Sequence, residues 1–75
     1  MFGLRKTEHA KFKMGQRGIS DKRLGATLKY GEILNKHGAY AYHYNRLTVL
    51  VRDNAIITAY NQRHRDFLKE CRKSK

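Results

Sequence analysis

Cysteine and long apolar runs are the first things that this sequence lacks. Cys71 is the only cysteine, so an internal disulfide and the cysteine-rich zinc folds are excluded. The longest aliphatic runs have three residues, as in Val49-Leu50-Val51, and the mean hydropathy is −0.81. A membrane-spanning helix needs about 20 apolar residues, so we expect no membrane segment. No secretory signal is visible, and a reducing cytoplasm is therefore the expected location.

Acidic residues are also few, and their spacing excludes most metal chemistry. The 6 acidic residues stand singly rather than in the clusters that hold two metal ions. The 4 histidines form no helical pair spaced for a metal, and the sequence has neither a P-loop nor a glycine-rich dinucleotide turn. We therefore expect no metal and no cofactor.

Basic residues are abundant, and they define the expected partner. The chain has 17 Lys and Arg against 6 Asp and Glu, which gives a net charge of +11 and a pI of about 10.2. A chain of this charge attracts polyanions, so nucleic acid is the leading partner class, with RNA favoured. We expect no membrane partner.

The length of 75 residues is enough for one domain and too short for two. Apolar residues make up 40% of the chain and aromatic residues 11%, which argues against disorder. We expect a single domain over residues 1–75, with its core spanning about residues 7–71. A core of this size leaves about 3–5 kcal/mol of net stability, so both a monomer and a homodimer stay open.

Two helices are predicted before any strand, and glycine ends both because the chain has no proline. The first covers the stretch from Thr7 to Gln16. Thr7 is its N-cap, Ala10 and Met14 form its apolar stripe, and Gly18 closes it.

The second helix has a stronger start signal. Ser20 is a good N-cap, and Ile19 and Leu24 occupy the positions of a hydrophobic staple. Leu24 and Leu28 are expected to face the core, and Gly31 ends the helix.

From Glu32 onward the apolar period changes from nearly four to two, which indicates strands. Three strands are predicted over residues 40–44, 47–51 and 55–60, with a tight turn at Asp53-Asn54 between the last two. Residues 32–35 are expected to add a fourth strand at the edge of the sheet.

The tail from Gln62 to Lys73 is predicted as a last, basic helix that places Phe67 and Cys71 on the sheet. Cys71 is interpreted as a small core residue rather than a nucleophile. The expected fold class is α+β: one or two N-terminal helices packed on a three- or four-stranded antiparallel sheet, with a C-terminal basic helix.

One chemistry remains open to such a chain, namely RNA cleavage without a metal, in which side chains move the protons and cations stabilise the phosphorane. His9, Lys13 and Arg17 are four residues apart and share one face of the first helix. This stripe could meet a phosphate, and the alternative interpretation is a solvated basic face.

Aromatic and cationic residues farther along the chain also have two interpretations. Tyr40, Tyr42 and Tyr44 alternate along one strand, where they could stack on unpaired bases, although we favour packing of the sheet. Arg63 and Arg65 give the last helix a cationic start suited to contacts with a nucleic-acid backbone.

Three segments together resemble a known family. Residues 9–20 read HAKFKMGQRGIS, residues 29–33 read KYGEI and residues 56–60 read IITAY. These resemble a small, mostly bacterial and phage family known as domain of unknown function 4258. Its members tend to read His-Ala, then Arg-Met three residues on, then Arg-Gly-Ile-Ser.

The resemblance implies a fold and a set of functional positions. The family has been grouped with the barnase, EndoU, colicin and RelE-like toxin fold, in which helices pack on an antiparallel sheet, often in RNA-cutting toxins. It implies functional roles for His9, Arg17, Thr58 and Tyr60. Lys13 stands where the family tends to have Arg, which keeps the charge but loses a bidentate grip on phosphate.

These observations predict a small basic nucleic-acid-binding domain and leave open whether it also cleaves RNA as a metal-independent, toxin-like ribonuclease. His9 and Tyr60 are the candidate catalytic residues. The candidate substrate-binding residues are Lys13, Arg17, Thr58, Arg63 and Arg65.

We expect His9, Lys13, Arg17, Thr58 and Tyr60 to converge on one concavity between the first helix and the sheet. The structural alternative is a buried hydrogen bond between His9 and Tyr60 that braces the helix against the sheet. Two functional alternatives stay open: a non-catalytic RNA-, DNA- or ribosome-binding module, and a subunit that docks an acidic protein such as an inhibitor.

Overall fold

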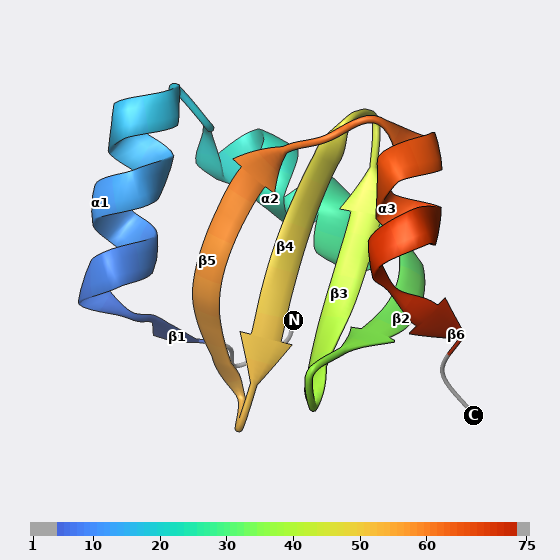
Figure 1. The fold of residues 1–75 in the computed structure, drawn as a ribbon. Coiled ribbons are helices and arrows are strands. Elements are labelled where there is room, and N and C mark those ends of the chain that lie inside the picture. Colours follow the sequence, from blue (N-terminus) through green and yellow to red (C-terminus); the bar gives the residue numbers. More distant parts are fainter. Residues whose placement is uncertain (1–4, 74–75) are drawn as a thin grey trace.

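The computed structural model describes residues 5–73, whose strands form one six-stranded sheet in the order β1-β5-β4-β3-β2-β6. Figure 1 shows α2 behind the sheet, α3 in front of it and α1 alongside β5. None of the helices formed by these residues is long and apolar enough to cross a membrane. In chain order the elements are β1 (Arg5–Lys6), α1 (Glu8–Arg17), α2 (Asp21–Tyr30), β2 (Glu32–Lys36), β3 (Ala39–Tyr44), β4 (Leu47–Arg52), β5 (Ala55–Asn61), α3 (His64–Glu70) and β6 (Arg72–Lys73).

The first two helices begin and end where the sequence predicts. The hydroxyl of Thr7 accepts a hydrogen bond from the Ala10 N–H at 3.1 Å, and Gly18 ends α1 with a φ of 67°. The hydroxyl of Ser20 accepts from the Arg23 N–H at 3.2 Å in the same way. Local capping chemistry therefore fixes both helix starts.

Three two-residue turns connect β2 to β5 as consecutive hairpins. Both residues of each turn have positive φ, as the type I′ turn requires. This turn type is favoured in two-residue hairpins because its twist matches that of the strands it joins. The predicted Asp53-Asn54 turn is confirmed, with φ of 52° and 60°. The other two turns are His37-Gly38 and Asn45-Arg46.

The sheet has more strands than the predicted three or four, and it is mixed rather than antiparallel. β1 pairs with β5 in parallel, and β6 pairs with β2 antiparallel. β2 therefore lies inside the sheet, not at its edge. Each added strand has two residues and pairs through its main chain, so no alternating apolar pattern in the sequence indicates either strand.

The last helix is shorter than predicted. It ends at Glu70, and Cys71 adopts an extended conformation with φ −113° and ψ 154°. The chain then pairs with β2, which satisfies main-chain groups that a longer helix would leave open at the sheet edge. Phe67 and Cys71 are both buried, as expected, so the interpretation of Cys71 as a core residue is confirmed.

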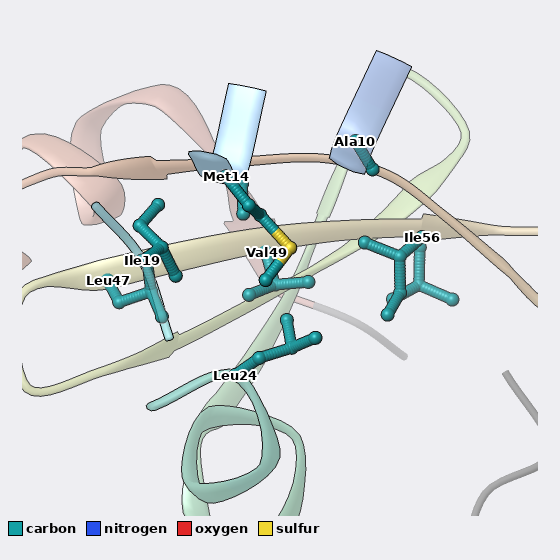
Figure 2. Packing of buried hydrophobic residues seen from close by; sticks show 9 residues of the cluster. Ala10, Met14, Ile19, Leu24, Leu47, Val49 and Ile56 are labelled. Carbon is teal, nitrogen blue, oxygen red and sulfur yellow. The ribbon is translucent and has the colours of Figure 1, made fainter. Parts of the chain in front are cut away.

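Each face of the sheet has its own apolar cluster because side chains alternate along a strand. The larger cluster joins α1 and α2 to the sheet, and Figure 2 shows Met14, Leu24 and Val49 packing together in it. Leu28 is only partly buried against it. Its buried members are Ala10, Met14, Ile19, Leu24, Leu47, Val49, Val51, Ile56 and Ala59. The smaller cluster, under α3, consists of Leu34, Ala41, Phe67 and Cys71.

Candidate functional site

The three residues of the predicted helix stripe are on α1, but they do not form one site. His9 and Arg17 are exposed, and Lys13 is half-buried with its ammonium 5.9 Å from the centroid of the Phe12 ring. Arg17 donates from Nη1 to the main-chain oxygen of Ala59 at 2.8 Å. β1 pairs with β5 only as far as Ile56, so Arg17 covers the next stretch of that edge.

Thr58 and Tyr60 face the other side of the sheet. Ala59 belongs to the cluster under α1, so its two neighbours in β5 must point away from that cluster. In the register they lie opposite Leu50 and Thr48, on the side that carries α3. The prediction that these residues converge with His9, Lys13 and Arg17 on one concavity between the first helix and the sheet is therefore wrong.

The alternative pairing of His9 with Tyr60 is also wrong. The Tyr60 hydroxyl accepts a hydrogen bond from the ammonium of Lys36 at 3.2 Å, and His9 is exposed on α1. The same ammonium donates to Glu70 Oε1 at 3.2 Å, so a phenol, an ammonium and a carboxylate meet beside α3.

This contact continues as a chain of hydrogen bonds across the sheet. Gln62 donates from Nε2 to Glu70 Oε1 at 2.8 Å and accepts from the Thr48 hydroxyl at 2.7 Å. The Thr48 oxygen is then free to accept from His43, whose Nδ1 lies 2.9 Å away, so the proton of the neutral ring sits on Nδ1. We call these residues the sheet-face network: Lys36, His43, Thr48, Tyr60, Gln62 and Glu70.

The ionisable groups of the sheet-face network have shifted pKa values. Hydrogen bonds from Gln62 and then Lys36 lower the pKa of the Glu70 carboxyl. Burial would lower the pKa of Lys36, but its hydrogen bonds to Tyr60 and Glu70 outweigh burial and raise it. Burial is the main cause that lowers the pKa of His43. At neutral pH this network therefore holds a charged Lys36–Glu70 pair and a neutral imidazole.

An open groove of about 890 Å³ lies at the end of the sheet where β4 begins and β5 ends. It is formed by α2, the β3–β4 turn, the end of β5 and α3, and it shares Gln62 and Glu70 with the sheet-face network. We call it the basic groove. It is lined by Arg23, Asn45, Arg46, Asn61, Gln62, Arg63, Asp66, Lys69 and Glu70.

Positive charge predominates among these lining residues. Arg63 Nε lies 3.4 Å from Asp66 Oδ2, so the carboxylate of Asp66 compensates part of the charge of Arg63. Arg23 donates from Nη2 to Asn61 Oδ1 at 3.2 Å, so its guanidinium is held by a neutral partner. Within residues 5–73, no ion pair engages Arg46 or Lys69, the two other cations of the groove. An anion that enters the groove can therefore meet charge that the protein has left uncompensated.

The predicted binding residues of the last helix divide between groove and solvent. Arg63 lines the basic groove, as a backbone-contacting residue would, whereas Arg65 is exposed outside it. Thr58 is half-buried on the α3 side of the sheet. The roles assigned to these side chains stay predictions.

Sequence reasoning missed most of the basic groove because its residues come from four separate segments. One signal was available for the sheet-face network: His43 and Thr48 are polar residues at buried positions of two strands in which the other buried residues are apolar. A polar side chain on a buried face needs a partner, so these two positions marked the network in advance.

Metal-ligating side chains do not gather anywhere in the described part of the chain: no group of three or more His, Cys, Asp or Glu is placed to hold an ion.

A family model described as "Domain of unknown function (DUF4258)" matches residues 7–65. The comparisons with curated proteins and with solved structures gave no match. The resemblance seen in the sequence is thereby confirmed, and the grouping with the toxin fold stays a prediction.

Proposed function

Because the chain belongs to the family described as a domain of unknown function (DUF4258), we propose a function from its own surface, namely that it binds RNA in the basic groove. The observation that carries the proposal is the groove itself, which gathers Arg23, Arg46, Arg63 and Lys69 from three segments of a chain whose net charge is +11. Arginine forks and lysine ammonium groups are the usual donors to phosphate oxygens.

Salt dependence is the direct test of this proposal. Binding of a fluorescent single-stranded RNA of about ten nucleotides is followed by anisotropy between about 50 and 200 mM salt. Each phosphate contact contributes about 0.7 to the log–log slope, so the Arg46→Gln/Arg63→Gln double variant should lower the slope by about 1.4.

A matched control removes two charges elsewhere. Lys11 is exposed on α1, and Arg52 is exposed at the opposite end of β4, so Lys11→Gln/Arg52→Gln lowers the net charge equally without touching the groove. It should leave the slope unchanged. No binding at low salt, or equal losses in both double variants, would contradict the proposal. Binding of an acidic protein in place of RNA would favour the docking alternative.

We propose RNA cleavage as a second function, and a specific contact supports it. Tyr60, Lys36 and Glu70 are joined by hydrogen bonds, and Glu70 also lines the basic groove. An ionised carboxylate can take the proton of a 2′-hydroxyl, whose oxygen then attacks phosphorus. A phenol or ammonium can protonate the 5′-oxygen that leaves, giving a 2′,3′-cyclic phosphate and a free 5′-hydroxyl.

The cleavage test measures cyclic-phosphate ends formed from RNA in a buffer that contains a chelator. Tyr60→Phe and Glu70→Gln should each slow the reaction by about 10²- to 10⁴-fold if those groups transfer protons. His9→Ala tests the assignment that came from the family resemblance, since its side chain is exposed on α1, away from Tyr60. RNA that is bound but stays uncut would leave the non-catalytic binding module as the function.

A further inference from the structure

Two exposed tyrosines lie beside the basic groove and are not explained by the core. Tyr30, the last residue of α2, is 63% exposed, and Tyr44, the last residue of β3, is 41% exposed. Their ring centroids are 5.9 Å apart with an interplanar angle of 41°, so they form one continuous aromatic surface. We call them the aromatic pair.

The aromatic pair and the basic groove share the β3–β4 turn. Tyr44 is followed directly by Asn45 and Arg46, both of which line the groove. Arg23, another lining residue, reaches this turn from α2 and donates to the main-chain oxygen of Asn45 at 3.5 Å. A ligand that contacts Asn45 and Arg46 in the groove therefore lies at the turn that directly follows Tyr44.

The surroundings of the aromatic pair are cationic. The Lys29 ammonium lies 5.3 Å from the centroid of the Tyr30 ring, and Arg46 is two residues from Tyr44. An apolar partner gains little from rings flanked by charge. A nucleotide gains twice, because its base can stack on a ring while its phosphate meets the cation.

We propose that the aromatic pair is a stacking site for unpaired nucleobases, so that the ligand of the basic groove is single-stranded rather than duplex RNA. The inference rests on the proposed function, RNA binding in the groove, and it adds the strand state of the ligand. In a duplex the base faces are covered by their neighbours, whereas every unpaired base offers a free face to an aromatic ring.

The net charge argues against a second copy of this chain as the occupant of the aromatic pair. Each copy carries +11, and a contact at Tyr30 would bring two sets of cations together. An RNA strand instead supplies negative charge to an end of the molecule where four cationic side chains outnumber two carboxylates.

The experiment compares single-stranded and duplex RNA of one sequence for wild type and for the variant Tyr30→Ala/Tyr44→Thr. Threonine is chosen at position 44 because it suits a strand. Stacking on an aromatic side chain is lost on substitution, so single-stranded affinity should fall by about 5- to 150-fold per ring. Duplex affinity and the salt slope should not change, because the groove keeps its cations.

Two further variants serve as controls. Tyr30→Phe/Tyr44→Phe keeps both rings and should retain wild-type affinity. Phe12→Ala removes an equally exposed ring, at 64%, which has Lys13 5.9 Å from its centroid but lies on α1 outside the groove. This variant should bind single-stranded RNA as wild type does.

The outcomes separate this inference from the function on which it rests. If wild type binds with a groove-dependent salt slope but holds duplex as tightly as single strands, the stacking site is overturned and RNA binding stands. The same holds if the double tyrosine variant binds single strands within about twofold of wild type. Self-association of wild type that this variant abolishes would assign the aromatic pair to a dimer contact instead. An absence of any binding at low salt would overturn both proposals.

Discussion

The two faces of the sheet follow different rules of packing. On the side of α1 and α2, alternate residues of β4 place Leu47, Val49 and Val51 in a purely apolar cluster. On the side of α3, the same strand presents Thr48, which is fully buried and bonded to His43 and Gln62. β4 therefore contributes side chains to an apolar core on one side of the sheet and to a polar network on the other.

This difference separates two kinds of packing along a single strand. The three residues that β4 places on the apolar face have no polar side-chain group to satisfy, so burial stabilises them. The α3 face satisfies each of its buried polar atoms, and no buried side-chain N or O atom in the described residues lacks a partner. Fully paired polar groups hold a fixed geometry, which a binding or catalytic site requires, and Gln62 and Glu70 carry that order into the basic groove.

The largest expected effect concerns the apolar face. Leu47 is 1% exposed, so Leu47→Ala should lower the free energy of unfolding by about 2–5 kcal/mol through lost burial and a residual cavity. Urea unfolding followed by circular dichroism measures this. Leu68→Ala, at a leucine that is 47% exposed, is the matched control and should cost far less. Equal costs at the two positions would show that the apolar face is not the main source of stability.

A reciprocal exchange tests the polarity of the two faces directly. Thr48→Val and Val49→Thr are nearly isosteric and alter adjacent residues on opposite sides of β4. Thr48→Val leaves His43 and Gln62 without their partner, and Val49→Thr buries a hydroxyl among apolar groups, so each should cost about 1–3 kcal/mol in urea unfolding. A more stable Thr48→Val variant would mean that the network destabilises the fold.

The smallest expected effect is a pH dependence that arises on the α3 face. Burial, aided by the nearby His64 and opposed by Glu32, holds the pKa of His43 below the 6.5 of an unperturbed histidine. As the pH falls, His43 therefore binds a proton at a higher pH in the unfolded chain than in the folded chain. The free energy of unfolding then decreases as the pH drops below about 6.5.

Unfolding midpoints compared above and below that pH measure this dependence. His43→Gln keeps a donor for Thr48 but does not titrate, so its midpoint should change less over the same interval. Glu70 does not interfere, because its contribution is lost only below the ordinary carboxyl pKa of 4.5. A wild-type midpoint that is constant across the interval would show that His43 keeps its ordinary pKa when folded.

Much of the fold was predictable from the sequence, because its signals are local. Thr7 and Ser20 cap their helices as their chemistry dictates, and the alternation in residues 40–60 produces the three central strands. The two-residue strands β1 and β6 were not predictable, since main-chain pairing needs no particular side chain. The parallel pairing of β1 with β5 is the reason that the sheet is mixed.

The candidate site was predictable only in part. The residues of α1 and β5 were identified one by one, and Thr58 and Tyr60 do share one side of their strand. The prediction that Thr58 and Tyr60 share a site with His9 was wrong because Ala59, which lies between them, is the residue that packs toward α1. The alternation of the strand then turns both of them toward α3.

The sequence by itself determined the charge of this protein, its helix caps, its hairpin turn at Asp53-Asn54 and the apolar alternation of its strands, because each depends on residues that are neighbours in the chain. Only the tertiary structure decided which cations share a groove and which partner each buried polar group finds. Arg23, Arg46 and Arg63 lie far apart in sequence and meet because α2 and two strand ends come together at one end of the sheet. Long-range packing sets such meetings, and no local pattern records them.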